Sequence, residues 1–98
     1  MKFIVSEKKG PHGALLVITD SDIIGKKFEE KNLQLDLSKG FYQGEEVSEE
    51  DVRKIITKAK DLHLTGKVIV AMALSLKFID PNRILYINNV PHAEIVVG

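Results

Sequence analysis

The chain has 98 residues, of which 44% are hydrophobic and 29% are charged, and this composition is typical of one globular domain spanning residues 1–98. The start of the chain turns polar too soon for a signal peptide, and no apolar run approaches the roughly 18 residues of a membrane span, so we expect a cytoplasmic protein without membrane contact. The absence of cysteine excludes disulfides, thiol catalysis and zinc ribbons, so we expect no metal and no cofactor.

The first third of the chain predicts three strands. Residues 3–5 and 14–19 are short β-branched apolar runs, and a loop at residues 8–13 joins them, so they predict an antiparallel pair. Asp20-Ser21-Asp22 predicts the cap of a short helical turn that runs through Phe28, because such side chains bind free amides at a helix start. Residues 33–37 alternate between leucine and polar residues, which predicts a strand whose leucines face the core.

The middle of the chain predicts two helices. Ser48, followed by three acidic residues, resembles a capping box, and an apolar stripe with helical spacing then predicts a helix from Glu49 to His63. The stripe consists of Val52, Ile55, Ile56, Ala59 and Leu62. Residues 67–78 are apolar on all sides, so the pattern fits a strand at its start and a helix afterwards. We interpret this segment as a buried helix that ends by Asp80, before a proline.

The tail predicts a tight hairpin. Asn88-Asn89 can adopt the positive φ angles of a type I′ turn, so Tyr86 faces Pro91 at a position where the missing proline amide breaks no hydrogen bond within the hairpin. The same register pairs Leu85 with His92 and Arg83 with Glu94. In this register the side chains on the core side are those of Ile84, Tyr86, Ala93, Ile95 and Val97. The opposite face carries Leu85, His92 and Glu94, so we expect His92 to be partly accessible.

These elements predict an α+β fold. We expect two layers: a mostly antiparallel sheet of four or five strands, and two helices that cover one face of it. No phosphate loop, dinucleotide fingerprint, zinc-helix motif, calcium loop or nucleophile elbow occurs in the sequence. The standard motifs therefore define no reaction.

His92 is the candidate for acid–base chemistry. A histidine titrates near neutral pH, and here Glu45 or Glu94 could orient it while Tyr42 donates a hydrogen bond. The alternative is a structural histidine on a strand surface beside a salt bridge. One histidine and one carboxylate occur in nearly every protein, so we expect binding rather than catalysis. His12 and His63 are interpreted as a loop-tip residue and a helix-end residue.

A basic stripe on and just beyond the first helix is the candidate for nucleic-acid binding. The net charge is zero, so a nucleic acid would have to use such a local patch. The stripe consists of Arg53, Lys54, Lys58, Lys60 and Lys67. Phe41 or Tyr42 could add a stacking surface. The alternative is an ordinary solvated helix face, which we favour because Glu50 lies one turn before Lys54.

Four segments together resemble an archaeal family known as domain of unknown function 424. They are Phe41-Tyr42-Gln43-Gly44-Glu45, Leu64-Thr65-Gly66-Lys67, Val90-Pro91-His92-Ala93 and Asp22-Ile23-Ile24-Gly25-Lys26. The chain departs from the family at Asn88-Asn89, where glycines are expected, and at Glu94, where glutamine is expected. The resemblance implies an archaeal cytoplasmic protein with a compact α+β fold and an association with translation, and it implies no defined activity. The matched positions are Phe41, Tyr42, Gly44, Glu45, Pro91 and His92.

We therefore expect a small non-enzymatic binding module, associated with RNA or the translation machinery. Its binding surface would lie between the Phe41–Glu45 loop and the tail hairpin. Two alternatives stay open. One is an enzyme that uses His92 as general acid or base, and the other is a structural or self-associating domain whose exposed strand edge forms a homodimer.

Overall fold

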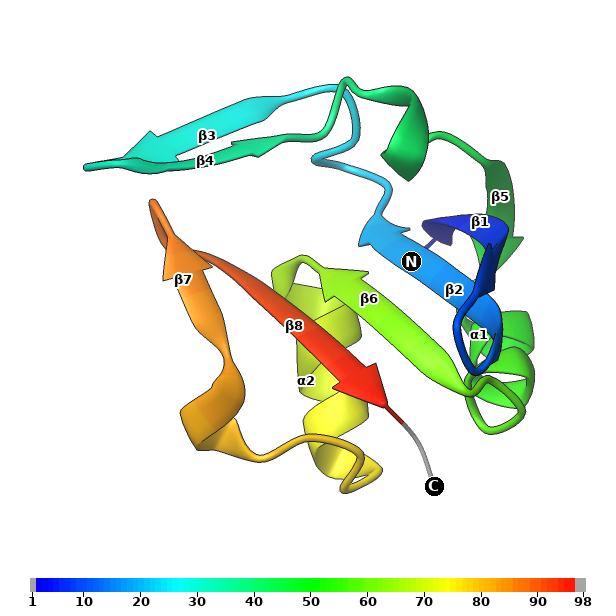
Figure 1. Ribbon diagram of the computed structural model, residues 1–98. Coiled ribbons are helices and arrows are strands. Elements are labelled where there is room, and N and C mark those ends of the chain that lie inside the picture. The colour runs from blue at the N-terminus through cyan, green and yellow to red at the C-terminus, as the bar shows by residue number, and fades with distance from the viewer. Residues whose placement is uncertain (1, 97–98) are drawn as a thin grey trace.

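The computed structural model describes residues 2–96 and consists of two helices and eight strands (Figure 1). In chain order the elements are β1 (Lys2–Gly10), β2 (Gly13–Asp20), β3 (Lys27–Glu30), β4 (Leu33–Asp36), the 3-10 helix η1 (Gly40–Tyr42), β5 (Glu45–Ser48), α1 (Glu49–Ile56), β6 (Asp61–Thr65), α2 (Lys67–Ser75), the 3-10 helix η2 (Pro81–Arg83), β7 (Leu85–Ile87) and β8 (Val90–Val96). Neither helix is long and apolar enough to cross a membrane.

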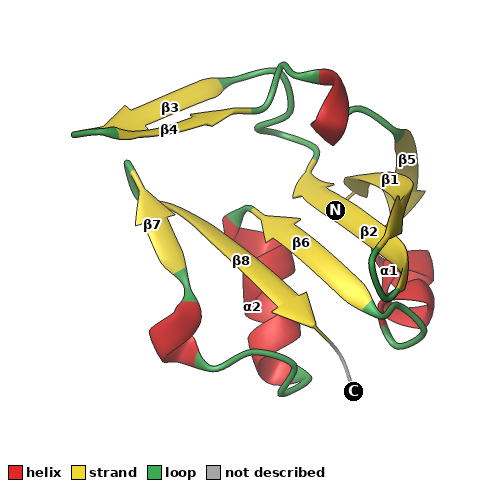
Figure 2. Cartoon of the chain, viewed as in Figure 1, coloured by secondary structure: helices red, strands yellow, loops and turns green. Residues whose placement is uncertain are grey.

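The strands form a six-stranded sheet in the order β5-β1-β2-β6-β8-β7 and a separate hairpin of β3 and β4 (Figure 2). Within the large sheet only the β2–β6 ladder is parallel. The predicted α+β class with two helices and a mostly antiparallel sheet is confirmed. The predicted sheet of four or five strands is wrong: β3, β5 and β6 were not recognised as strands, and the strand predicted at residues 33–37 lies in the separate hairpin.

The two faces of the large sheet have different partners. On one side, which we call the helix face, side chains of β1, β2, β6 and β8 form a single core with both helices. The opposite side, which we call the open face, meets the β3–β4 hairpin near the turn between β7 and β8. There Leu35 and Leu37 pack with Ile87 and Val90 in a second, smaller core. The remainder of the open face carries polar side chains of β6 and β8 beside apolar ones such as the buried Val17.

Helix α1 is shorter than the sequence predicts. Ser48 caps it as expected, since its hydroxyl accepts a hydrogen bond from the Asp51 amide at 3.3 Å. The helix ends at Ile56, however, and residues 61–65 form strand β6. Leu62 fits the predicted helical stripe only by coincidence, because it is buried as a residue of the strand β6. Along β6 it is alternate leucines that enter the core, which is a strand pattern.

Helix α2 is the predicted buried helix, and its N-terminus is capped from a distant strand. The Asp20 carboxylate, at the end of β2, accepts hydrogen bonds from the amides of Val68 and Ile69 at 2.8 and 2.9 Å. The predicted helical turn after Asp20 is wrong, because residues 21–25 form a turn and Phe28 lies in β3. Burial raises the pKa of the Asp20 carboxyl, although the two amide donors act in the opposite direction.

Helix α2 ends earlier than the proline requires. Its last residue is Ser75, and Lys77 then adopts a left-handed conformation with φ of 62°. Pro81 instead begins the short helix η2, whose cap is the Asp80 side chain. The proline therefore starts a helix here, and a left-handed residue ends the preceding one.

The tail forms the predicted hairpin. Asn88 and Asn89 have φ angles of 49° and 67°, and Tyr86 faces Pro91 in the expected register. Two details differ. Arg83 lies in η2, so its predicted pairing with Glu94 is replaced by contacts of Glu94 with histidines. Tyr86, predicted on the core side, is 55% exposed because it lies on the edge strand of the sheet. Val97 lies outside the described residues.

Candidate functional site

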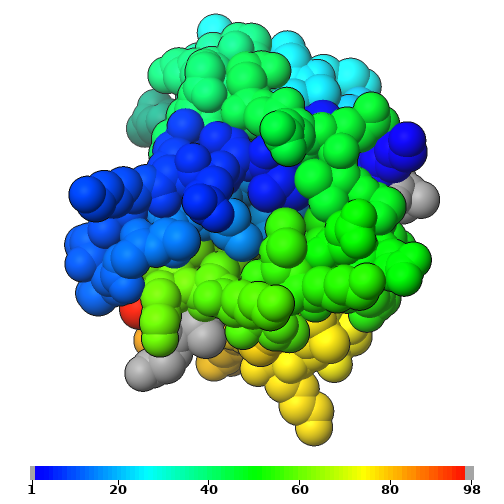
Figure 3. All heavy atoms as spheres, turned by 90° about the vertical axis from the view of Figure 1, so that its right-hand side faces the viewer, coloured from blue at the N-terminus to red at the C-terminus, as the bar shows by residue number. Residues whose placement is uncertain are grey.

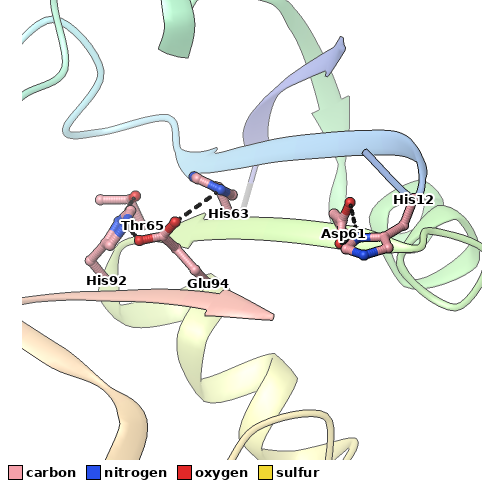
Figure 4. Close-up of polar contacts among 6 residues, drawn as sticks. All are labelled: His12, Asp61, His63, Thr65, His92 and Glu94. Carbon is pink, nitrogen blue, oxygen red and sulfur yellow. Dashed lines mark hydrogen bonds and ion pairs between the residues drawn. The ribbon is translucent and has the colours of Figure 1, made fainter. Parts of the chain in front are cut away.

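The candidate site lies on the open face of β6 and β8. These strands are antiparallel neighbours in which His63 faces Glu94 and Thr65 faces His92. Leu62 and Leu64 of β6 and Ile95 of β8 face the helices, so alternation along each strand turns these four side chains to the open face. Two strands from different parts of the chain thus form one polar cluster (Figure 4).

Glu94 connects two histidines. Its Oε1 atom lies 3.1 Å from His63 Nε2, and its Oε2 atom lies 3.7 Å from His92 Nε2. Figure 4 shows the carboxylate between the two imidazole rings, whose centroids are 6.1 Å apart. The Glu94 side chain is 62% exposed, whereas only 25% of His63 is exposed. The carboxylate is therefore the part of the cluster that a ligand reaches first.

His92 is the most enclosed member of the cluster. Its side chain is 12% exposed, so His92 is partly accessible as the register predicts, although it is more enclosed than an ordinary surface histidine. Its Nδ1 atom shares a hydrogen bond of 2.8 Å with the hydroxyl of Thr65, a fully buried residue. The Glu94 carboxylate favours a proton on Nε2, so the Thr65 hydroxyl donates to Nδ1. Burial lowers the pKa of His92, and His63 adds to this, while Glu94 opposes it.

The lowered pKa of His92 predicts a loss of stability in mild acid. The unfolded chain binds a proton at His92 near its ordinary pKa of 6.5, while the folded protein binds it only at lower pH. This contribution is fully present above pH 6.5 and is lost as the pH falls through the folded pKa. Urea denaturation between about pH 7.5 and 5 should show the loss, and His92→Gln should reduce it. An imidazole titration by NMR that gives His92 a pKa at or above 6.5 would contradict this expectation.

Phe41 joins the cluster from η1. Its ring makes edge contacts with His63, at a centroid distance of 5.5 Å, and with Tyr42 at 5.1 Å. The ammonium of Lys8 lies 5.2 Å from the Phe41 ring centroid, in cation–π geometry. Tyr42 also packs against the smaller core, and its pKa is raised by burial and by the negative charges of Glu94 and Asp36. The Phe41–Glu45 loop and the tail are thus connected through His63, which sequence reasoning had placed on a helix.

We call this group the aromatic–histidine surface. It consists of Lys8, Phe41, Tyr42, His63, His92 and Glu94.

A second imidazole–carboxylate pair lies further along β6. His12, at the tip of the β1–β2 hairpin, has its Nδ1 atom 3.2 Å from Asp61 Oδ1. Both residues line a pocket of about 220 Å³ together with His63 and Glu94. Among residues 2–96, no group of three or more histidine, cysteine or acidic side chains has an arrangement that could hold a metal ion. The pocket presents proton donors and acceptors along one strand.

Glu45 lies far from His92. Three strands separate β5 from β8, which corresponds to roughly 19 Å at the usual strand spacing. Glu45 also pairs with Val5, whose side chain joins the core of the helix face, whereas His92 lies on the open face. Glu45 therefore cannot orient His92, and Glu94 is the carboxylate that does so.

Gly44 and Pro91 serve the backbone. A Cβ atom at Gly44 would lie 2.1 Å from the Val5 carbonyl oxygen, so only glycine lets the chain pass β1 at this point. The Pro91 carbonyl accepts a hydrogen bond from the Gly66 amide at 2.9 Å, just before α2 begins. Backbone geometry therefore accounts for both residues in the segments that resemble the family.

The basic stripe is divided by ion pairs and by the shorter α1. Arg53 lies 3.5 Å from Glu49, and Lys54 lies 3.8 Å from Glu50, both at helical i,i+4 spacing. Lys58 and Lys60 follow the end of α1 in a turn, and Lys67 begins α2. These ion pairs are typical of a solvated helix face, which stays our prediction for the stripe.

The family model described as "Protein of unknown function (DUF424)" matches residues 7–97. The chain belongs to the DUF424 family. No curated protein sequence matches it significantly. Among solved structures, the fold is similar to the crystal structure of an uncharacterized conserved protein from Methanopyrus kandleri, with a TM-score of 0.75. That match covers 100% of this chain and 95% of the other at 16% identity, so it supports the DUF424 fold and carries no activity.

Proposed function

We propose that this DUF424 protein is a non-enzymatic, cytoplasmic binding module that holds single-stranded RNA at the aromatic–histidine surface. The observation that carries the proposal is the meeting of the Lys8 ammonium, the Phe41 ring and the His63 imidazole on the open face. Proteins that bind single strands combine cations for the phosphates with flat rings on which bases stack.

Each group on this surface has a role in such binding. Phe41 and His63 are planar and only partly buried, so a base can stack on either of them. The Lys8 ammonium lies over the Phe41 ring, where it can contact the phosphate of a nucleotide that binds there. The Glu94 carboxylate can accept a hydrogen bond from the exocyclic amino group of a base, and its negative charge repels phosphate. The surface therefore favours contact with both bases and backbone.

The proposal predicts that Phe41→Ala weakens RNA binding. Loss of one stacked base costs about 1–3 kcal/mol, which corresponds to roughly 5- to 150-fold in Kd. Lys8→Gln should lower affinity and reduce the slope of log K against log salt by about 0.7, because one phosphate contact is lost. Fluorescence anisotropy with labelled oligouridylate and oligoadenylate of about ten nucleotides, at several salt concentrations, measures both effects.

Lys54→Gln is the matched control for Lys8→Gln. Lys54 is an exposed lysine, but it lies on α1 and is paired with Glu50. RNA affinity should change little with this substitution. Absence of binding at about 50 mM salt would contradict the proposal, and so would an equal loss of affinity in the Lys54→Gln variant.

Acid–base catalysis is the second candidate, and the position of Glu94 between two histidines favours it. A neutral His92 held by Thr65 and a second imidazole nearby provide a base and a potential acid. The same oligonucleotides distinguish the two functions. A binding module leaves them intact during long incubation, whereas an enzyme acting on RNA cleaves them and loses this activity in His63→Ala and His92→Ala.

A further inference from the structure

An apolar groove lies on the helix face, away from the aromatic–histidine surface. Its volume is about 680 Å³, which is within the range of ligand-binding pockets. Strands β1 and β2 form its floor and the end of α1 forms its wall, and Figure 3 views this side of the molecule. The apolar side chains that line it are Val5, Ala14, Leu16, Val47, Ile55 and Ala59.

The groove exists because α1 is short. With eight residues, the helix is roughly 12 Å long, while the hairpin of β1 and β2 continues to Gly10 and Gly13. The helix therefore covers the sheet near Phe3 and leaves the sheet face near Ala14 without a covering helix. Ala14 is exposed, although Leu16, the next residue of β2 on this face, is buried.

An open strand edge runs beside the groove. β5 pairs with β1 only from Lys2 to Val5, whereas β1 continues to Gly10. Gly44, which leads into β5, lies against Val5 and Ser6 at the point where the two strands separate. Within residues 2–96, no strand pairs with the outer edge of residues 7–10. Backbone groups along this edge are free to accept another strand.

Two carboxylates lie where this edge meets the groove. Glu7 and Glu45 both line the groove, and neither forms an ion pair within the described part of the chain. Lys9 lies further along β1, opposite Ala14, and Lys58 lies on the opposite wall, just after α1. The position between Glu7 and Glu45 therefore favours a basic group.

We propose that residues 7–10 of β1 bind an extended, basic peptide segment of a partner protein by strand addition. The peptide backbone pairs with the free edge, and alternate apolar side chains enter the groove, as in other complexes formed by β-augmentation. A lysine or arginine of the peptide lies between Glu7 and Glu45. This interaction uses a different face of the molecule from the proposed RNA site.

A pair of synthetic peptides tests the proposal. One, the lysine–valine peptide, has the sequence Thr-Val-Thr-Lys-Thr-Val, so its valines and its lysine share one face of the strand, and in the other, the glutamate–valine peptide, glutamate replaces the lysine. In NMR titrations the lysine–valine peptide should bind saturably, at least about tenfold more tightly than the glutamate–valine peptide, and it should shift the amide signals of residues 7–10 and Ala14. Glu45→Lys should weaken this binding at least about fivefold, since it reverses one charge on the rim.

Glu46→Lys is the matched control, because Glu46 is the next residue of β5 and points to the other face of the sheet. It should leave the affinity unchanged. Ala14→Trp fills the groove and should abolish binding. The proposal is wrong if neither peptide binds saturably, if Glu45→Lys and Glu46→Lys behave alike, or if the shifts map to the other sheet edge at β7. Shifts of residues 7–10 that depend on protein concentration alone would assign the edge to a second copy instead.

Discussion

Gly66→Ala is expected to destabilise the protein by roughly 4 kcal/mol, combining backbone strain with overpacking. Gly66 has φ of 122° and ψ of 155°, a conformation essentially restricted to glycine. A Cβ atom there would also lie 2.3 Å from Cγ of the buried Asp20 side chain. The new methyl group must displace the carboxylate that caps α2. Urea denaturation monitored by circular dichroism measures the loss.

Gly25→Ala separates the two causes. Gly25 also has a positive φ, 85°, but nothing lies within 4 Å of a Cβ atom placed there. This variant should therefore show only the cost of a left-handed residue, about 1 kcal/mol. Equal destabilisation by Gly25→Ala and Gly66→Ala would mean that the helix N-terminus accommodates a methyl group, and the described packing around Asp20 would then be wrong.

Asp20→Ala is expected to cost about 3 kcal/mol, because it leaves two amide groups at a buried helix start without acceptors. The residue is only 3% exposed, so water replaces the carboxylate poorly. Asp20→Asn should cost about half as much, since its amide oxygen still accepts one of the two hydrogen bonds. The same denaturation experiment compares both variants with the wild type.

A double-mutant cycle connects the two sites. Because Gly66→Ala is expected to act partly by moving Asp20, the destabilisation in the Asp20→Ala, Gly66→Ala double mutant should be smaller than the sum of the single effects. Additive effects would show that the glycine and the aspartate stabilise α2 independently.

Local signals in the sequence predicted their elements correctly. The Asn88-Asn89 turn predicts the hairpin register from local residues, because both adopt positive φ, although Glu30 of β3 also accepts a hydrogen bond from the Asn88 amide. Ser48 likewise caps the helix that follows it directly, because its partner, the Asp51 amide, is only three residues away. In each case the residues that determine the structure are adjacent in the chain.

Predictions failed where the partner was distant. Asp20 has the chemistry of a helix cap, which was correctly recognised, but it caps α2 rather than the segment that follows it. Sequence spacing gives no means of choosing a helix so far along the chain. The end of α1 was missed for another reason, because Leu62 satisfies both the helical stripe and the strand alternation.

The candidate site was predicted in part. Phe41, Tyr42 and His92 were selected, and the structure places them around His63, which connects η1 to the tail. His63 was overlooked because the helix was extended through it. The available signal was the alternation of polar and apolar residues along β6, which turns Asp61, His63 and Thr65 to one face.

The order of strands in the large sheet also bears on how the protein folds. Only the β1–β2 and β7–β8 ladders join strands that are consecutive in the chain. In the parallel ladder Thr19 pairs with Thr65, so nearly half of the chain must be closed into a loop before this contact forms. Such a high contact order slows folding relative to helical proteins of equal size. The two hairpins can form early, whereas the pairings of β1 with β5 and of β2 with β6 close the longest loops and cost the most loop-closure entropy. The pairing of β2 with β6 also brings Asp20 to α2.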